Sequence, residues 1–215
     1  SFIYAANLDV DFVEFDVRRT RDNVLVTIHD EFVDRTTNGH GRVVDMSYSE
    51  IRRLDAGAWF SPIYAGTRIP LLSEALDVLS GYNKKLILDL KDRVDLDLIT
   101  SLVSKYGLCG RIYLASSLVS VLCDAKNYNF PLMYISGRLN IRNLKQAVKI
   151  GVDIIAPISR RISSKAVDRF KSNNMLVNVG PIDSYDDLVR YLGLGVDIVT
   201  TNMPDIIARI RRMIL

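Results

Sequence analysis

Six short apolar runs recur along the chain at a spacing of about 22 residues, and this period constrains the fold more than any other feature. Each run is almost continuously apolar, as parallel β-strands are when both faces of their sheet are covered. The stretches between the runs are long enough for a crossover helix and show helical periodicity. The period therefore predicts a β/α repeat with strands at 86–91, 111–116, 131–136, 153–158, 175–180 and 197–202.

The N-terminal part of the chain departs from this period. A run at 12–17 predicts a further strand, and residues 1–8 are typical of the end of a helix. The run at 24–30 follows too closely for a helical crossover, so we expect it to return antiparallel after a turn. We interpret residues 31–68 as an insertion packed over one end of the strands, with a helix at 72–79 resuming the repeat.

The number of strands favours a barrel. Seven parallel β/α units are one short of a closed eight-stranded ring, and a strand upstream of Ser1 would complete it. We therefore predict that residues 1–215 form one domain, a (β/α)8 TIM barrel whose first strand is missing from this chain. An open doubly wound α/β sheet is the alternative. With 215 residues and 48% hydrophobic content, the chain can bury the core of such a domain.

Charge and composition exclude several classes of partner. The net charge of +3 is too small to favour nucleic acid or an anionic membrane surface. No apolar run approaches the ~20 residues needed to cross a bilayer, and we see no exposed apolar loop that could enter one. We expect no stable membrane insertion. The two cysteines favour a reducing, cytoplasmic setting, and the oligomeric state is left open.

Acidic side chains interrupt two of the predicted strands. Glu14 and Asp16 stand two residues apart, so their side chains point to the same face. Asp89 interrupts another strand, with Lys91 on its same face. In a barrel, such groups gather at the carboxyl ends of the strands, where clustered carboxylates need a cation. Hard oxygen ligands suit Mg²⁺ or Ca²⁺, and a metal plus Lys91 suits an anionic phosphate; exposed acids or a simple Asp89–Lys91 ion pair are the alternatives.

One of the two histidines is a candidate for proton transfer. His29 ends an apolar run and is followed by Asp30, within reach of the same end of the barrel. Imidazole titrates near neutral pH, so His29 could act as a general acid or base. His40 lies in a glycine-flanked turn and is interpreted as a loop residue.

The same residues belong to a series of motifs that resembles the glycerophosphodiester phosphodiesterase family. The match is densest over residues 9–74, and a looser likeness continues through LDLK and GVDIVTTNMPD. So many motifs in order make the resemblance specific. They are the Glu-x-Asp strand at 14–16, the His-Asp pair at 29–30, Arg-Thr-Thr at 35–37, Leu-Asp-Ala-Gly at 54–57 and Ile-Pro-x-Leu-x-Glu-x-Leu at 69–76.

The resemblance implies metal-dependent hydrolysis of small-molecule glycerophosphodiesters to glycerol 3-phosphate and an alcohol. It also implies roles for residues: Glu14, Asp16 and Asp89 as metal ligands, Lys91 as the phosphate contact and His29 as one of two catalytic histidines. The other histidine belongs to a His-Arg-Gly motif that would lie upstream of Ser1. A barrel truly lacking it would be a non-catalytic phosphodiester-binding module, and a related phospholipase-like barrel is the other alternative.

Four positions depart from the family pattern. Asp89 is shorter by one methylene than the usual Glu, and Gly180 stands where many members carry Trp, which predicts the loss of an aromatic wall. Asp183 replaces a usual Asn, and Asn202 replaces a common Asp. The lost aromatic wall at Gly180 predicts altered selectivity for the alcohol group, while the alcohol itself and the preferred metal are not indicated.

Overall fold

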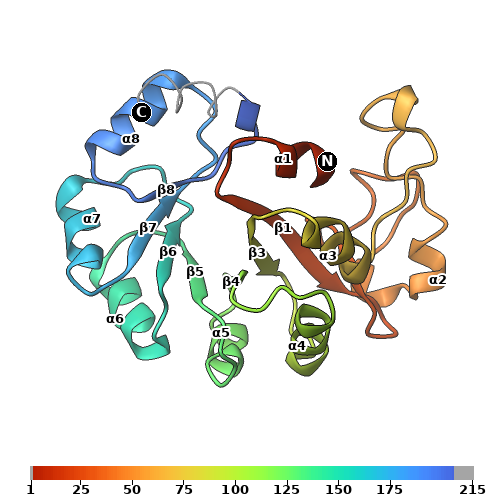
Figure 1. Cartoon of the computed structure of the whole chain (residues 1–215), viewed down its shortest axis with the longest axis horizontal. Helices are drawn as coiled ribbons and strands as arrows, with labels where there is room; N and C mark the ends of the chain where they lie inside the picture. Colours follow the sequence, from red (N-terminus) through yellow and green to blue (C-terminus); the bar gives the residue numbers. More distant parts are fainter. Residues whose placement is uncertain (1, 206–215) are drawn as a thin grey trace.

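A curled β-sheet with helices along its outer side forms the body of the molecule, in a computed structural model that describes residues 2–205 (Figure 1). The strands occur in the sheet in the order β2-β1-β3-β4-β5-β6-β7-β8, with β2 antiparallel and all others parallel. Their bounds are β1 (Phe12–Arg19), β2 (Leu25–Thr27), β3 (Lys85–Leu90), β4 (Ile112–Ser116), β5 (Leu132–Ser136), β6 (Ile154–Pro157), β7 (Leu176–Val179) and β8 (Ile198–Val199).

This order confirms the β/α repeat predicted from the period. From β1 through β8 the parallel strands follow one another without a reversal, whereas a doubly wound sheet needs a point at which the order reverses. The antiparallel return of the second run is also confirmed, with Val17 opposite Thr27. Among the described residues the sheet is open between β8 and β1. The closing strand expected upstream of Ser1 stays a prediction.

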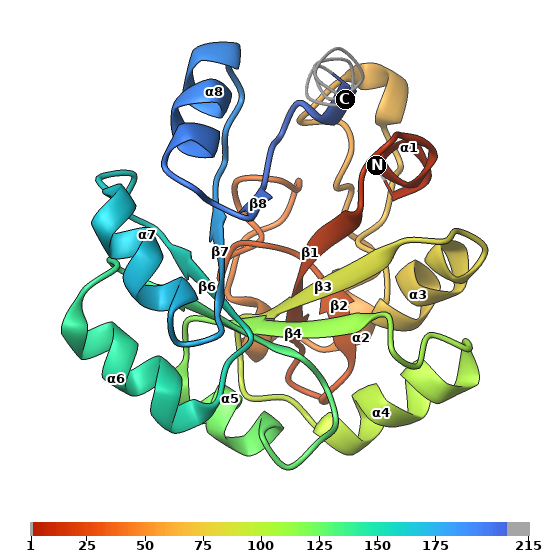
Figure 2. The same ribbon diagram turned by 60° about the vertical axis from the view of Figure 1, so that its left-hand side comes forward.

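Each crossover carries a helix on the outside of the sheet (Figure 2). Two of these helices begin at serine caps: the side chains of Ser163 and Ser184 each accept a hydrogen bond from a first-turn backbone N–H. The described helices are α1 (Phe2–Asn7), α2 (Tyr48–Ile51), α3 (Leu72–Ser80), α4 (Leu96–Lys105), α5 (Val119–Ala125), α6 (Ile141–Ile150), α7 (Ser164–Lys171) and α8 (Tyr185–Gly193), with single 3₁₀ turns η1 (Val43–Asp45) and η2 (Pro62–Tyr64). None of the helices between residues 2 and 205 has both the length and the apolarity to cross a bilayer.

Strand alternation divides the core into two layers. On β3, Leu86, Leu88 and Leu90 pack outward in the large cluster between sheet and helices. Ile87 points to the inside of the curl, where it joins a smaller cluster with Met133 and Ile154. Asp89 has the same parity as Ile87 and therefore also points inward, one step closer to the carboxyl ends of the strands.

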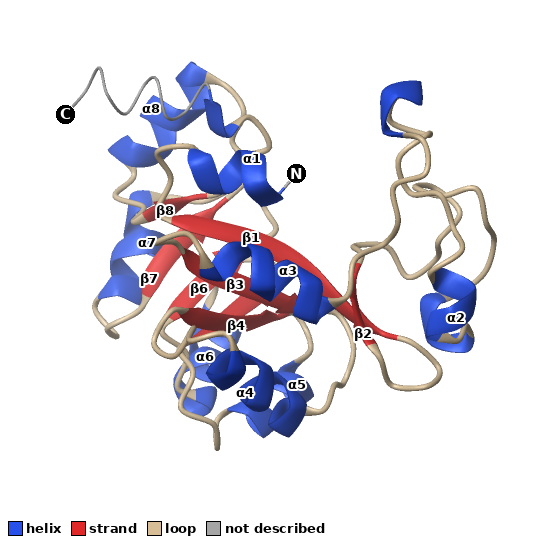
Figure 3. Cartoon of the chain, turned by 45° about the vertical axis from the view of Figure 1, so that its right-hand side comes forward, coloured by secondary structure: helices blue, strands red, loops and turns tan. Residues whose placement is uncertain are grey.

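The segment between β2 and α3 has a small core of its own. Val33, Val43 and Ile51 are fully buried against each other and against the start of the segment, separately from the two layers of the barrel. Figure 3 shows this segment standing beside the sheet, past the end of β2. Its interpretation as an insertion stays a prediction.

One expectation about this segment is wrong. From the sequence we expected no loop with exposed apolar side chains. In the structure Trp59, Phe60, Ile63 and Tyr64 are each more than half exposed. Hydrophobic residues in a short loop carry no periodicity that would tell a buried from an exposed position, so the pattern gave no signal here.

Asp55 holds the base of this exposed loop together. Its carboxylate accepts hydrogen bonds from the backbone N–H groups of Gly57 (2.8 Å), Ala58 (3.0 Å) and Gly66 (2.7 Å). These donors, that of Gly66 foremost, hold the pKa of Asp55 below its ordinary value. The ionised carboxylate is therefore the form that the folded loop requires.

We expect Asp55→Asn to lower the free energy of unfolding, because the amide NH₂ opposes one of these N–H donors. The native pKa is depressed, so the contribution of Asp55 is complete above the unfolded value of 3.8 and is lost as pH falls below it. Urea unfolding of parent and variant should differ most above about pH 4 and converge in stronger acid. A difference that grows on acidification would contradict this role.

Candidate active site

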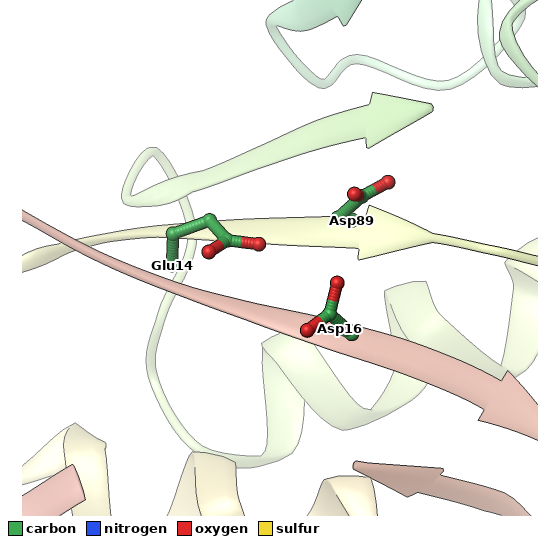
Figure 4. Close-up of side chains that lie close together, drawn as sticks. All are labelled: Glu14, Asp16 and Asp89. Atoms are coloured by element: carbon green, nitrogen blue, oxygen red, sulfur yellow. The ribbon is translucent and has the colours of Figure 1, made fainter. Parts of the chain in front are cut away.

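The pairing of β1 with β3 brings three carboxylates together at the carboxyl end of the sheet. Asp16 lies directly opposite Asp89 in the parallel register, and Glu14 precedes Asp16 by two residues on the same face. One oxygen from each carboxylate lies within 4.8 Å of the others. Figure 4 shows the three side chains converging over the two neighbouring strands. The sequence therefore predicted correctly that these residues meet.

The three carboxylates are close enough to repel one another when they are ionised. Burial raises the pKa of Glu14 to about 7, and repulsion from Asp16 and Asp89 adds to this rise. The Glu14 side chain is exposed to solvent on one side, which weakens the effect of burial on its pKa. Repulsion from the neighbouring carboxylates is therefore the better-supported cause of the raised pKa. Burial likewise raises the pKa of Asp89, although the nearby Lys91 opposes it.

Lys91 supplies the positive charge next to these acids. Its ammonium donates to Asp89 and lies 3.0 Å from Asp16 Oδ1. Burial alone would lower the pKa of Lys91, but the two carboxylates outweigh it and raise the pKa. The ammonium therefore stays protonated between Asp16 and Asp89. The simple ion pair considered for Asp89 and Lys91 is thus present, as part of a larger cluster.

The donor set fits a divalent cation. Asp89 Oδ1 is buried and has no hydrogen-bond partner among the described residues, so one hard oxygen points into the cluster unsatisfied. A single lysine does not neutralise three carboxylates, whereas an additional divalent ion would. Glu14, Asp16 and Asp89 could therefore hold Mg²⁺ or Ca²⁺.

Asp30 contacts the His29 ring, and Arg35 in turn contacts Asp30. His29 Nδ1 lies 2.6 Å from Asp30 Oδ1, and Arg35 donates to both oxygens of Asp30 at 2.6 and 3.1 Å. The hydrogen bonds from Arg35 and His29 keep the pKa of Asp30 well below its usual range. Because ionised Asp30 can only accept, Nδ1 must donate, and Nε2 is the ring nitrogen available for proton transfer.

Two residues that the sequence did not single out tie His29 to the strands that carry the three carboxylates. Arg18 Nε donates to the backbone carbonyl of His29 at 3.0 Å, and Arg18 Nη1 donates to Asp92 at 3.0 Å. Asp92 follows β3 and also accepts from the backbone N–H of Arg19. The imidazole is close enough to Asp89 to contribute to its pKa. The only signal in the sequence was the charge of these residues next to the motifs.

A cavity of about 320 Å³ adjoins the carboxylates on the other side. Glu14 and Asp89 line it together with Arg160, Asn178 and Gly180. A Cβ at Gly180 would lie 2.7 Å from the carbonyl oxygen of Thr200, so close packing of β7 on β8 requires glycine here. The wall at this position is therefore backbone, in keeping with the predicted absence of an aromatic side chain.

His40, by contrast, lies in the loop as expected. Its side chain is 87% exposed, and its Nδ1 is 3.1 Å from Asp34. Within the described residues its side chain pairs with Asp34 and with none of the three clustered carboxylates, so it serves as a reference histidine for experiments.

Comparison with known proteins explains this combination of motifs and geometry. The family model described as "Glycerophosphoryl diester phosphodiesterase family" matches residues 1–206. The chain belongs to this family. It is 30% identical to a glycerophosphodiester phosphodiesterase of Caldanaerobacter subterraneus subsp. tengcongensis over 99% of this chain and 90% of the relative. A glycerophosphodiester phosphodiesterase of Bacillus subtilis is 28% identical over 99% of this chain and 80% of its own length.

Solved structures share the fold. A phosphodiesterase of Oleispira antarctica, solved with the product sn-glycerol-3-phosphate, has a TM-score of 0.88 at 22% identity and covers 99% of this chain and 88% of its own. A glycerophosphodiester phosphodiesterase of Agrobacterium tumefaciens has a TM-score of 0.80 at 27% identity, covering 96% and 90%. The resemblance inferred from the motifs is confirmed.

Two departures from the family pattern turn out to be partners. Asp183 Oδ1 accepts from the backbone N–H of Asn202 at 2.7 Å, and Asp183 Oδ2 accepts from the Asn202 side chain at 3.0 Å. The usual Asn at 183 and the usual Asp at 202 are therefore exchanged with each other, and one amide and one carboxylate still meet between the loop after β7 and the end of β8. This pairing predicts that the two departures compensate each other.

We expect each single reversal to destabilise the protein by about 1 kcal/mol, and the double reversal to restore most of the loss. Asp183→Asn removes the charged acceptor, and Asn202→Asp places two carboxylates face to face. Chemical unfolding of both single variants and of D183N/N202D measures the coupling. Additive losses in the double variant would contradict the compensation.

Proposed function

We propose that the chain hydrolyses glycerophosphodiesters to glycerol 3-phosphate and an alcohol, with a divalent cation held by Glu14, Asp16 and Asp89. The convergence of these carboxylates through the Asp16–Asp89 register carries this proposal. Its relatives, which are named glycerophosphodiester phosphodiesterases, and the product bound to the Oleispira antarctica enzyme support it. Residues 1–215 then act as one barrel domain, with 31–68 as its insertion.

The bound cation supplies charge neutralisation for the phosphoryl oxygens and for the developing negative charge. With the carboxylates satisfied in this way, the Lys91 ammonium is free to pair with the substrate phosphate. Burial of Lys91 at the cluster strengthens that pairing, because fewer waters compete for the charge.

His29 is the proposed proton carrier on this side of the site. Ionised Asp30 fixes the Nδ1–H tautomer, so Nε2 can take a proton from the nucleophile or return one to the leaving alcohol. Arg35 holds Asp30 in place, and Arg18 fixes the backbone of His29. The nucleophile is either water or the hydroxyl adjacent to the phosphoester.

We expect His29→Ala to lower the rate of glycerophosphocholine hydrolysis by about 10²–10⁴ while leaving the protein folded, because a half-exposed imidazole contributes little to the core. His40→Ala is the matched control and should keep the parental rate. The assay follows glycerol 3-phosphate release during a metal titration. Parental activity in His29→Ala would remove His29 from the reaction, and an inactive parent would favour the non-catalytic binding module.

Cation binding is measured separately from activity. Mg²⁺ or Ca²⁺ should raise the thermal midpoint of the parent, because a ligand that binds only the folded state stabilises it. Asp89→Asn should lose most of this rise, since it removes a ligand whose oxygen is otherwise unpartnered. Asp168→Asn, an exposed residue of α7, is the control and should respond like the parent. An undiminished rise in Asp89→Asn would contradict the proposed ligand set.

A further inference from the structure

The loop between Ala56 and Thr67 ends in a group of exposed apolar side chains, which we call the aromatic tip: Trp59, Phe60, Ile63 and Tyr64. Phe60 is 70% and Ile63 82% exposed, and the other two are more than half exposed. The rings of Trp59, Phe60 and Tyr64 touch in sequence, with centroids 5.8 Å apart in each pair. A protein gains nothing in water from such a surface, so it indicates a contact with something apolar.

Hydrogen bonds within the loop fix the backbone that carries these exposed side chains. The backbone N–H of Phe60 donates to Gly57 at 3.0 Å, and that of Ala56 donates to Thr67 at 2.7 Å. Gly57 packs so closely on the carbonyl of Tyr64 that no Cβ would fit there. Trp59 Nε1 donates to Ala56 within the loop at 3.0 Å, so the indole needs no further polar partner. The tip is therefore a preformed surface.

Charge is arranged around the tip as a lipid–water interface requires. No charged residue stands between Asp55 and Arg68, so the tip itself is neutral. Arginines border this stretch: Arg53 precedes it, Arg68 follows it, and the Arg35 guanidinium lies 5.9 Å from the centre of the Trp59 ring. The exposed apolar and aromatic side chains suit the acyl region of a lipid leaflet, and the cations next to them suit its anionic headgroups.

Figures 1 and 3 place the short turn η2, which carries Ile63 and Tyr64, at the end of the segment farthest from the sheet. Arg35 connects the tip to the candidate active site, because the same guanidinium that lies against Trp59 also binds both oxygens of Asp30, the partner of His29. One side chain therefore links the aromatic tip to the residues that hold His29.

We propose that the aromatic tip docks the protein peripherally on a phospholipid membrane surface. Phe60 and Ile63 enter the acyl boundary, Trp59 and Tyr64 lie at the level of the headgroups, and Arg53 and Arg68, which border the loop in the sequence, pair with anionic lipids. This inference goes beyond the proposed hydrolysis and does not depend on it. It concerns contact with one leaflet, which needs no spanning helix.

Trp59 is the only tryptophan of the chain, so its fluorescence reports on the tip directly. With vesicles of equimolar phosphatidylcholine and phosphatidylglycerol, we expect a blue shift of its emission and quenching by brominated acyl chains in the parent protein. Vesicles of phosphatidylcholine alone should bind more weakly, and added salt should weaken binding to the anionic vesicles. Unchanged emission and no bromine quenching with both vesicles would overturn the proposal.

Variants separate the tip from general surface hydrophobicity. Phe60→Ser/Ile63→Ser keeps the reporter and should weaken co-sedimentation with the anionic vesicles by about tenfold or more. Val148→Ser, at a 52% exposed site on α6, is the matched control and should bind like the parent. Equal binding of all three proteins would overturn the proposal. So would a blue shift that grows with protein concentration without lipid, which would assign the tip to a second copy of the chain.

Hydrolysis of water-soluble glycerophosphocholine is measured in parallel. The Phe60→Ser/Ile63→Ser variant should retain the parental rate on this substrate, which also shows that it is folded. Loss of vesicle binding with retained hydrolysis is the expected combination. An inactive parent that still binds vesicles would contradict the proposed function and leave the docking surface supported.

Discussion

The register between β1 and β3 is the constraint on which the candidate site depends. It places Asp16 opposite Asp89 and brings Glu14 to the same cluster, so three like charges share one end of the sheet. Lys91 balances only part of this charge, and the pKa of Glu14 rises to about 7 as a result of burial and repulsion. Such a cluster could hold a further cation, so the proposed ion site depends directly on this strand pairing.

The surrounding structure serves to hold this register and to bring His29 to it. Outward leucines of β3 pack under the helices, and the inward side of the same strand carries Ile87 and then Asp89. Arg18 and Asp92 join the ends of β1 and β3 to the backbone of His29. His29 and the carboxylates are thus fixed by contacts between three neighbouring segments rather than by one motif.

Much of the fold could be predicted from the sequence because strand spacing and apolar runs are local signals. The same holds for the carboxylates, since Glu14 and Asp16 share a face through the two-residue repeat. Contacts between distant segments left no such signal: the pairing of Asp183 with Asn202 looked like two unrelated departures. The exposure of Trp59 and Phe60 was equally invisible, because apolar residues in a loop look alike whether they are covered or not.

The central claim is that Glu14, Asp16 and Asp89 share a single divalent ion. Crystals of the protein soaked with Mn²⁺, which has the same preference for oxygen ligands as Mg²⁺ and Ca²⁺, test it most directly through anomalous scattering. We expect one strong anomalous peak within coordination distance of all three carboxylates. A peak bound elsewhere, with these side chains still paired only to Lys91, would contradict it.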